Sequence, residues 1–198
     1  MSRFDESGRA ATPSQTSQRT HHYVLKPTLH PHGWKLVIND GSGTLLYEVT
    51  RHPTTPVHYK LRASKTPKST PLKIKSVKIG HVLRYTLTEG DDELLSIYLG
   101  LNAPSVRVQD KQRQTIARFS NINEEIVMLR TPTASVARIK FKEKPAPLNV
   151  QVNCTAEGDL QWLYAIILYT VARIEDEDVT LLPEEEHALE VEETESNG

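Results

Sequence analysis

The sequence predicts a mainly β protein, a barrel of about twelve strands that encloses one hydrophobic C-terminal helix. Turn-forming residues recur through residues 22–153 at intervals of about 8–12 positions, which is typical of short antiparallel strands. Residues 159–174, by contrast, are expected to form a helix, and the apolar side chains of residues 162–172 point in every direction around its axis. A barrel of about eight strands has room only for side chains, whereas a wider one needs a plug or a lumen. Twelve strands would leave a space about one helix wide.

Alternation of apolar and polar residues places the expected strands in order. They cover residues 22–26, 34–39, 44–50, 57–62, 72–79, 82–88, 93–99, 105–109, 114–119, 125–130, 135–142 and 148–153. Asp40-Gly41-Ser42-Gly43 predicts the tight turn between the second and third strands, because Asp-Gly readily adopts positive φ. No repeat of fixed period is visible, which disfavours a propeller or a solenoid.

The expected helix begins at Asp159, a plausible N-cap, and Arg173 suits the negative end of its dipole. The acidic run from Glu175 is unfavourable there and is expected to end the helix. About 16 helical residues span roughly 24 Å, and a six-residue strand spans roughly 20 Å. The helix therefore matches the barrel in length. The alternative is a two-sheet sandwich with the helix packed outside it.

The charges divide the chain of 198 residues into three parts, of which only the middle is expected to fold as a domain. Residues 1–21 are polar and are expected to form a disordered arm. The barrel, residues 22–174, is basic, and residues 23–174 carry 21 basic and 12 acidic side chains, a net charge of +9. Residues 175–198 carry 11 acidic and no basic residues and are expected to form a disordered acidic tail.

Composition also excludes several classes of protein. The single Cys154 rules out a disulfide scaffold and a multi-cysteine zinc site. The first residues hold no apolar segment, so we expect no secretory signal. The longest apolar run, residues 162–172, is shorter than the roughly 20 residues that span a bilayer. We expect a cytoplasmic protein, with a nuclear or peripheral membrane location left open.

A basic cluster is the main candidate binding site. No acidic residue occurs between Val49 and Thr88, and the alternation in Leu72-Lys73-Ile74-Lys75 places both lysines on one face of a strand. Such a face would attract the phosphates of an anionic membrane; the alternative is a solvated barrel exterior. The candidate anion-binding residues are Lys60, Arg62, Lys65, Lys68, Lys73, Lys75, Lys78 and Arg84.

No constellation predicts catalysis, a metal or a cofactor. Ser42 lies in a hairpin turn rather than a strand-to-helix elbow, so it is not expected to be a hydrolase nucleophile. No phosphate-binding glycine motif is present. Of the eight histidines, the pairs His21-His22 and His30-Pro31-His32 have no acidic neighbour that would complete a metal site. We therefore expect a protein that is not an enzyme.

The order of twelve strands and one hydrophobic C-terminal helix resembles the Tubby C-terminal-like superfamily, which includes Tubby domains, phospholipid scramblases and LURP-one-related proteins. Residues 36–49, with Asp40-Gly41-Ser42-Gly43 at their centre, resemble the "strand, D-x-x-G, strand" hairpin of the LURP-one-related and scramblase pattern. Residues 106–118 resemble a second such hairpin. The size and polar ends are like those of uncharacterised fungal members.

The resemblance implies a non-enzymatic module that binds anionic phospholipid or phosphoinositide headgroups through basic residues. A scramblase-like lipid transporter is the first alternative, although the cysteine cluster and calcium-binding segment of scramblases have no counterpart here. The second alternative is a protein-interaction module or a nucleic-acid-binding module. Aromatic residues are not interleaved with the basic cluster beyond Tyr59 and Tyr85, so single-stranded nucleic acid is a weak expectation.

The two charge blocks suggest a regulatory hypothesis. The acidic tail is tethered to the basic barrel, which raises the effective concentration of one for the other. Twenty-four flexible residues reach roughly 25–30 Å. The tail could therefore compete with an anionic ligand; the alternative is a tail that serves solubility.

Overall fold

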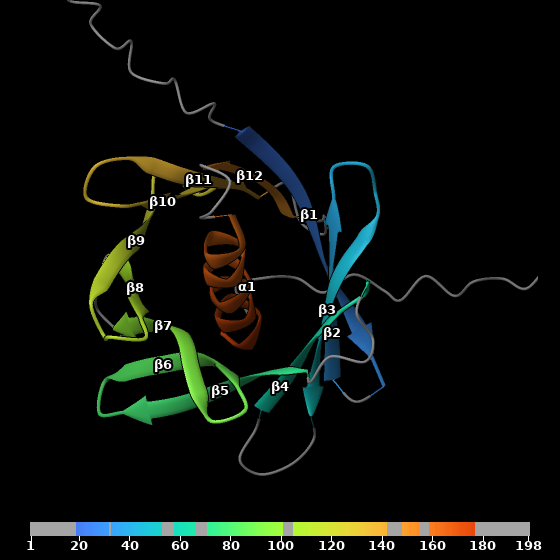
Figure 1. The fold of residues 1–198 in the computed structure, drawn as a ribbon, viewed down its shortest axis with the longest axis horizontal. Helices are drawn as coiled ribbons and strands as arrows, with labels where there is room; N and C mark the ends of the chain where they lie inside the picture. Colours follow the sequence, from blue (N-terminus) through green and yellow to red (C-terminus); the bar gives the residue numbers. More distant parts are fainter. Residues whose placement is uncertain are drawn as a thin grey trace, which may run out of the picture.

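Twelve antiparallel strands close into a barrel around a single helix in the computed structural model (Figure 1). The structure describes residues 19–31, 33–52, 58–65, 71–100, 105–141, 148–154 and 159–176. Each strand pairs with its neighbours in sequence, and the first strand also pairs with the last. The predicted fold class is confirmed.

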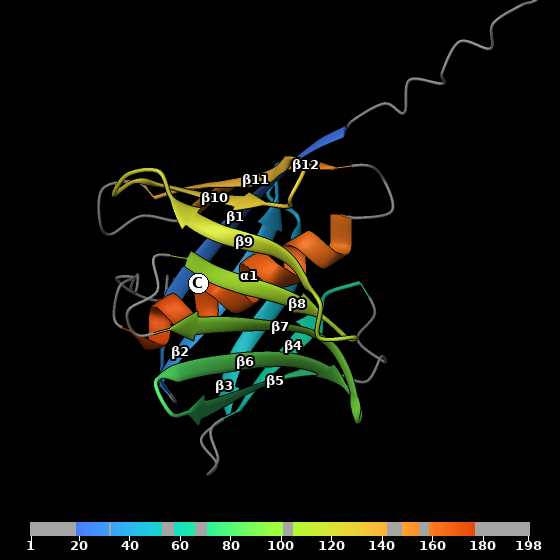
Figure 2. The same ribbon diagram turned by 90° about the vertical axis from the view of Figure 1, so that its left-hand side faces the viewer.

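The strands are β1 (Arg19–His30), β2 (Gly33–Asp40), β3 (Leu45–His52), β4 (His58–Ala63), β5 (Leu72–Ile79), β6 (Val82–Glu89), β7 (Asp92–Gly100), β8 (Ser105–Asp110), β9 (Thr115–Asn121), β10 (Ile126–Arg130), β11 (Ser135–Lys140) and β12 (Leu148–Cys154). The helix is α1 (Asp159–Glu175). Figure 2 shows the barrel from the side, with β8 and β9 in front of α1 and with β5 and β6 below it.

Closure depends on β1, which is longer than predicted. It begins at Arg19, opposite Cys154 of β12, so the predicted arm of residues 1–21 ends three residues too late. The β1–β12 pairing runs to Leu25 opposite Leu148, and β1 continues against β2 alone through Pro27. Because Pro27 follows the last β12 pair, its missing N–H leaves no gap in that ladder. The sandwich alternative is therefore wrong.

The helix is the centre of the hydrophobic core. Every residue from Ala165 to Ala172 is buried, as expected for a helix that is apolar all round. Phe119 of β9 and Tyr169 stack with ring centroids 4.3 Å apart. Thr170 is the polar residue in this run, and its hydroxyl donates a 2.9 Å hydrogen bond to the carbonyl of Ile166. The polar side chain in this run is thus satisfied by the helix itself.

The two hairpins identified in the sequence share one turn geometry. Asp40 Oδ1 accepts hydrogen bonds from the backbone of Ser42 and Thr44, each 2.9 Å long. Asp110 Oδ1 accepts them from Gln112 and Gln114, at 3.0 and 2.9 Å. The fourth turn residue has positive φ in both, 87° at Gly43 and 62° at Arg113. Arg113 therefore occupies a position that favours glycine.

Candidate anion-binding surface

The outer face of β5 carries the first part of the predicted site. Lys73 and Lys75 are exposed, and Ile74 between them is completely buried, as the alternation predicts. Lys60 of β4 lies directly opposite Lys73. We call Lys60, Lys73 and Lys75 the lysine strip. Among the residues that the structure describes, no carboxylate forms an ion pair with any of the three.

The remaining predicted residues differ from the lysine strip in their neighbours or in the face of the strand on which they lie. Arg62 lies opposite Glu48, whose carboxylate is 3.0 Å from Lys35 Nζ. Lys65 lies near Asp40; its charge lowers the pKa of Asp40 less than the hydrogen bond from the Ser42 side chain does. Lys78 is exposed but lies on the face of β5 that Ile74 occupies, not on the face of the lysine strip. Lys68 lies outside the described residues.

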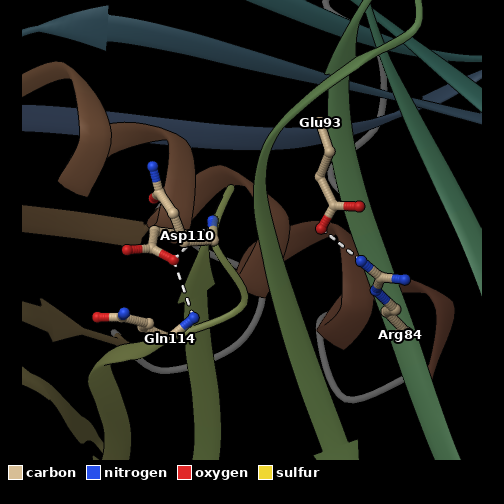
Figure 3. Close-up of polar contacts among 5 residues, drawn as sticks. Arg84, Glu93, Asp110 and Gln114 are labelled. Atoms are coloured by element: carbon tan, nitrogen blue, oxygen red, sulfur yellow. Dashed lines mark hydrogen bonds and ion pairs between the residues drawn. The ribbon is translucent and has the colours of Figure 1, made fainter.

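Arg84 is charge-compensated, unlike the lysine strip. Its guanidinium forms an ion pair with Glu93 of β7, shown in Figure 3, and lies 5.3 Å from the ring centroid of Tyr98. Its side chain is only 18% exposed. Arg84 therefore stabilises the β6–β7 pair, and the prediction that it belongs to the binding surface gains no support.

A second group of basic residues, which was not predicted, lies on the strands that follow Arg84 around the barrel. Arg84 lies opposite Tyr98, and Tyr98 lies opposite Arg107 of β8. Arg107 lies opposite Arg118 of β9, and Arg118 lies opposite Arg130 of β10. We call Arg107, Arg118 and Arg130 the arginine row. All three are exposed on the outer face.

Two carboxylates on β7 and β8, Glu93 and Asp110, have partners other than the arginine row. Glu93 pairs with Arg84, and Asp110 accepts the two backbone hydrogen bonds of its own turn, one of which is drawn in Figure 3. Within the described part of the chain, no ion pair reaches the arginine row. Like charges directly opposite one another destabilise a sheet. The row is therefore an uncompensated strip of positive charge.

A surface cavity of about 450 Å³ adjoins the arginine row. Arg118 and Arg130 line it, together with four residues that carry hydroxyl groups: Ser105, Thr115, Ser120 and Thr131. The other lining residues, Ile116, Ala117 and Pro132, are apolar, and none of the described residues that line it is acidic or aromatic. This combination of guanidinium and hydroxyl donors suits an anion.

A second cavity, of about 240 Å³, lies where α1 ends. Its lining includes Tyr85 and the charged residues Arg173, Glu175 and Asp176. Burial raises the pKa of Tyr85 to about 12, with smaller contributions from the charges of Glu175 and Asp176. Because charges of both signs meet there, the cavity has no clear preference for an anion.

Other classes of site find no support in the structure. No described helix has the length and apolar character needed to cross a membrane. Across the described ranges, no group of three or more histidine, cysteine, aspartate or glutamate side chains could hold a metal ion. The chain matches no protein-family model, no curated protein and no solved structure. The Tubby-like resemblance therefore stays a prediction.

Proposed function

We propose that the protein is a non-enzymatic binding module that recognises anionic phospholipid headgroups through the lysine strip. The observation that carries this proposal is the direct opposition of Lys60 and Lys73, with Lys75 beside them and no ion-pair partner among the described residues. Opposed like charges lower the stability of the barrel. An anionic surface would remove that penalty on binding.

Apolar residues on the same strand favour a membrane over nucleic acid. Beyond Lys75, the outer face of β5 continues with Val77 and Ile79, whose side chains are 53% and 57% exposed. Two lysines followed by two exposed aliphatic side chains match an anionic interface, in which headgroups lie above acyl chains. A nucleic-acid duplex offers phosphates but no comparable apolar layer. This difference makes lipid the preferred partner.

The test is sedimentation with phosphatidylcholine vesicles that contain phosphatidylserine. A Lys near an anionic surface contributes ~1 kcal/mol, so Lys73→Gln with Lys75→Gln should weaken binding about 30-fold. The matched control is Arg138→Gln with Lys140→Gln, two exposed residues with the same spacing on β11. Strands β5 and β11 lie six places apart in the closed order of twelve, on opposite sides of the barrel. The control should bind nearly as the wild type does.

Equal losses in both double variants would contradict the proposal, because binding would then follow net charge alone. Absence of binding by the wild type would contradict it as well. Val77→Ser with Ile79→Ser separates lipid from nucleic acid: vesicle binding should weaken while any binding of duplex DNA stays unchanged. A lipid-flipping assay with and without calcium tests the scramblase-like alternative, and we expect no flipping.

A further inference from the structure

We propose that the arginine row and its adjoining cavity form a second site, distinct from the lysine strip, for a compact ligand that carries two or more phosphate groups. The row lies on β8 to β10, and β6 and β7 separate it from the lysine strip on β4 and β5. Figure 2 shows β8 and β9 beside each other on the side of the barrel that faces the viewer.

The geometry of the row sets the size and charge of the ligand. Adjacent strands lie about 4.8 Å apart, so three directly opposed arginines span roughly 10 Å. A guanidinium presents a planar fork of donors that matches phosphate oxygens in pairs. A single phosphate can satisfy one or two such forks, whereas linked phosphates can meet all three. The row therefore favours a multiply phosphorylated ligand over orthophosphate.

The cavity argues for a small ligand held from more than one side. Its volume of about 450 Å³ lies in the range of small-molecule pockets. Its lining includes the hydroxyl-bearing residues Ser105, Thr115 and Ser120, whose hydroxyl groups can donate to further phosphate oxygens. The hydroxyl of Thr131, which also lines it, already donates to the carbonyl of Ala134. No described lining residue is aromatic, so the cavity offers no stacking surface for a nucleobase.

The turn of the same hairpin holds one residue in an unfavourable backbone conformation. Arg113, in the β8–β9 turn, has a φ of 62°, a left-handed conformation that costs a non-glycine residue roughly 1–2 kcal/mol. The equivalent turn residue between β2 and β3 is Gly43. The β8–β9 hairpin thus keeps a basic residue where glycine fits best. Such local cost is a feature of functional segments.

The experiment is calorimetric titration of the full chain with tripolyphosphate, pyrophosphate and orthophosphate. We expect tripolyphosphate to bind tightest and orthophosphate weakest. Arg118→Gln removes the central guanidinium and should weaken tripolyphosphate binding about 10- to 100-fold. Arg118→Lys keeps the charge without the planar fork and should recover only part of that loss. Arg138→Gln, an exposed arginine opposite Met128 and Gln151, is the matched control and should bind as the wild type does.

Two further arms fix the source of the phosphate groups and separate this site from the lysine strip. Vesicles that contain a bisphosphorylated phosphoinositide are titrated with the Lys73→Gln, Lys75→Gln variant and with the same variant that also carries Arg118→Gln: a loss of binding assigns the phosphates to a lipid headgroup, and unchanged binding assigns them to a soluble ligand. The Lys73→Gln, Lys75→Gln variant should still bind tripolyphosphate. Absence of tripolyphosphate binding, or equal losses in Arg118→Gln and Arg138→Gln, would overturn the inference.

Discussion

The indole Nε1 of Trp34 donates a 2.7 Å hydrogen bond to Oε1 of Glu175, the last residue of α1. Arg51 of β3 approaches the same carboxylate oxygen, with its Nε 3.8 Å away. A carboxylate is unfavourable at a helix C-terminus, and for this reason the sequence predicts that the helix ends at Ile174. The donors on β2 and β3 offset that penalty and join the helix end to the barrel wall.

We expect Glu175→Ala to lower the free energy of unfolding by about 1–3 kcal/mol, because it leaves the Trp34 indole N–H without its acceptor and removes the ion pair with Arg51. Urea denaturation measures the change. Trp34→Phe removes the donor and keeps an aromatic ring, so the double variant should lose less than the sum of the single variants. Strict additivity would show that the hydrogen bond does not couple the helix to the barrel.

We expect Arg113→Gly to raise stability by up to ~1.5 kcal/mol. Relief of the left-handed conformation raises the free energy of unfolding by ~1–2 kcal/mol. The greater conformational freedom of glycine in the unfolded chain lowers it by ~0.5–1 kcal/mol. The matched change is Gly43→Ala in the equivalent turn, where an added Cβ meets no atom within 4 Å and only the φ of 87° opposes it. That variant should be destabilised. A loss of stability in Arg113→Gly would contradict this account of the turn.

We expect stability to decline as the pH rises above about 10. An unfolded tyrosine ionises near pH 10, whereas burial raises the pKa of Tyr85 to about 12 in the folded protein. Between these values the unfolded state holds fewer protons, so stability falls with rising pH by at most ~1.4 kcal/mol per unit for this group. Denaturation of Tyr85→Phe across this range should show a shallower decline. Parallel curves would assign the loss to other residues.

We expect Ile167→Asp to abolish cooperative folding, because it places a carboxylate on a helix residue that is 1% exposed inside the barrel. The control on the same helix is Gln161→Asp, whose side chain is exposed near the helix N-terminus. Thermal melting followed by circular dichroism distinguishes them. A soluble Ile167→Asp protein with a cooperative transition would be incompatible with an enclosed helix.

We expect truncation after Asp176 to tighten binding to anionic vesicles at low salt, with a gain that shrinks as salt screens the charges. The removed segment, residues 177–198, holds nine acidic and no basic residues. A cut after Ile174, suggested by the charge pattern alone, would also remove Glu175 and its contacts with Trp34 and Arg51. Equal binding of the full and truncated chains at low salt would show that the tail does not compete with the vesicles and serves solubility alone.

The sequence predicted features that depend on local pattern. The all-round apolar helix predicted an enclosed core, and the alternation around Ile74 placed Lys73 and Lys75 on the outer face. Features that join distant segments were missed. The contact between Trp34 and Glu175 links residues 141 positions apart, and the sequence gives no local sign of it.

The arginine row was missed because its register depends on a bulge. The β8–β9 turn closes with Asp110 opposite Gln114, and counting back from that pair would set Arg107 opposite Ala117. A register shift between Val108 and Gln109 places Arg107 opposite Arg118 instead. A slip of one residue exchanges the two faces of a strand. The sequence shows the arginines but not that they share one line on the outer face.

Binding of the full chain to vesicles over a salt series tests the central claim most directly, namely that uncompensated positive charge on the barrel exterior recognises an anionic membrane. The same protein is titrated with phosphatidylcholine vesicles that contain or lack phosphatidylserine. The account predicts tight binding to the anionic vesicles at low salt, a steady weakening as ionic strength rises, and no binding to neutral vesicles. Equal binding to both vesicles, or no binding to the anionic ones at the lowest salt, would contradict it.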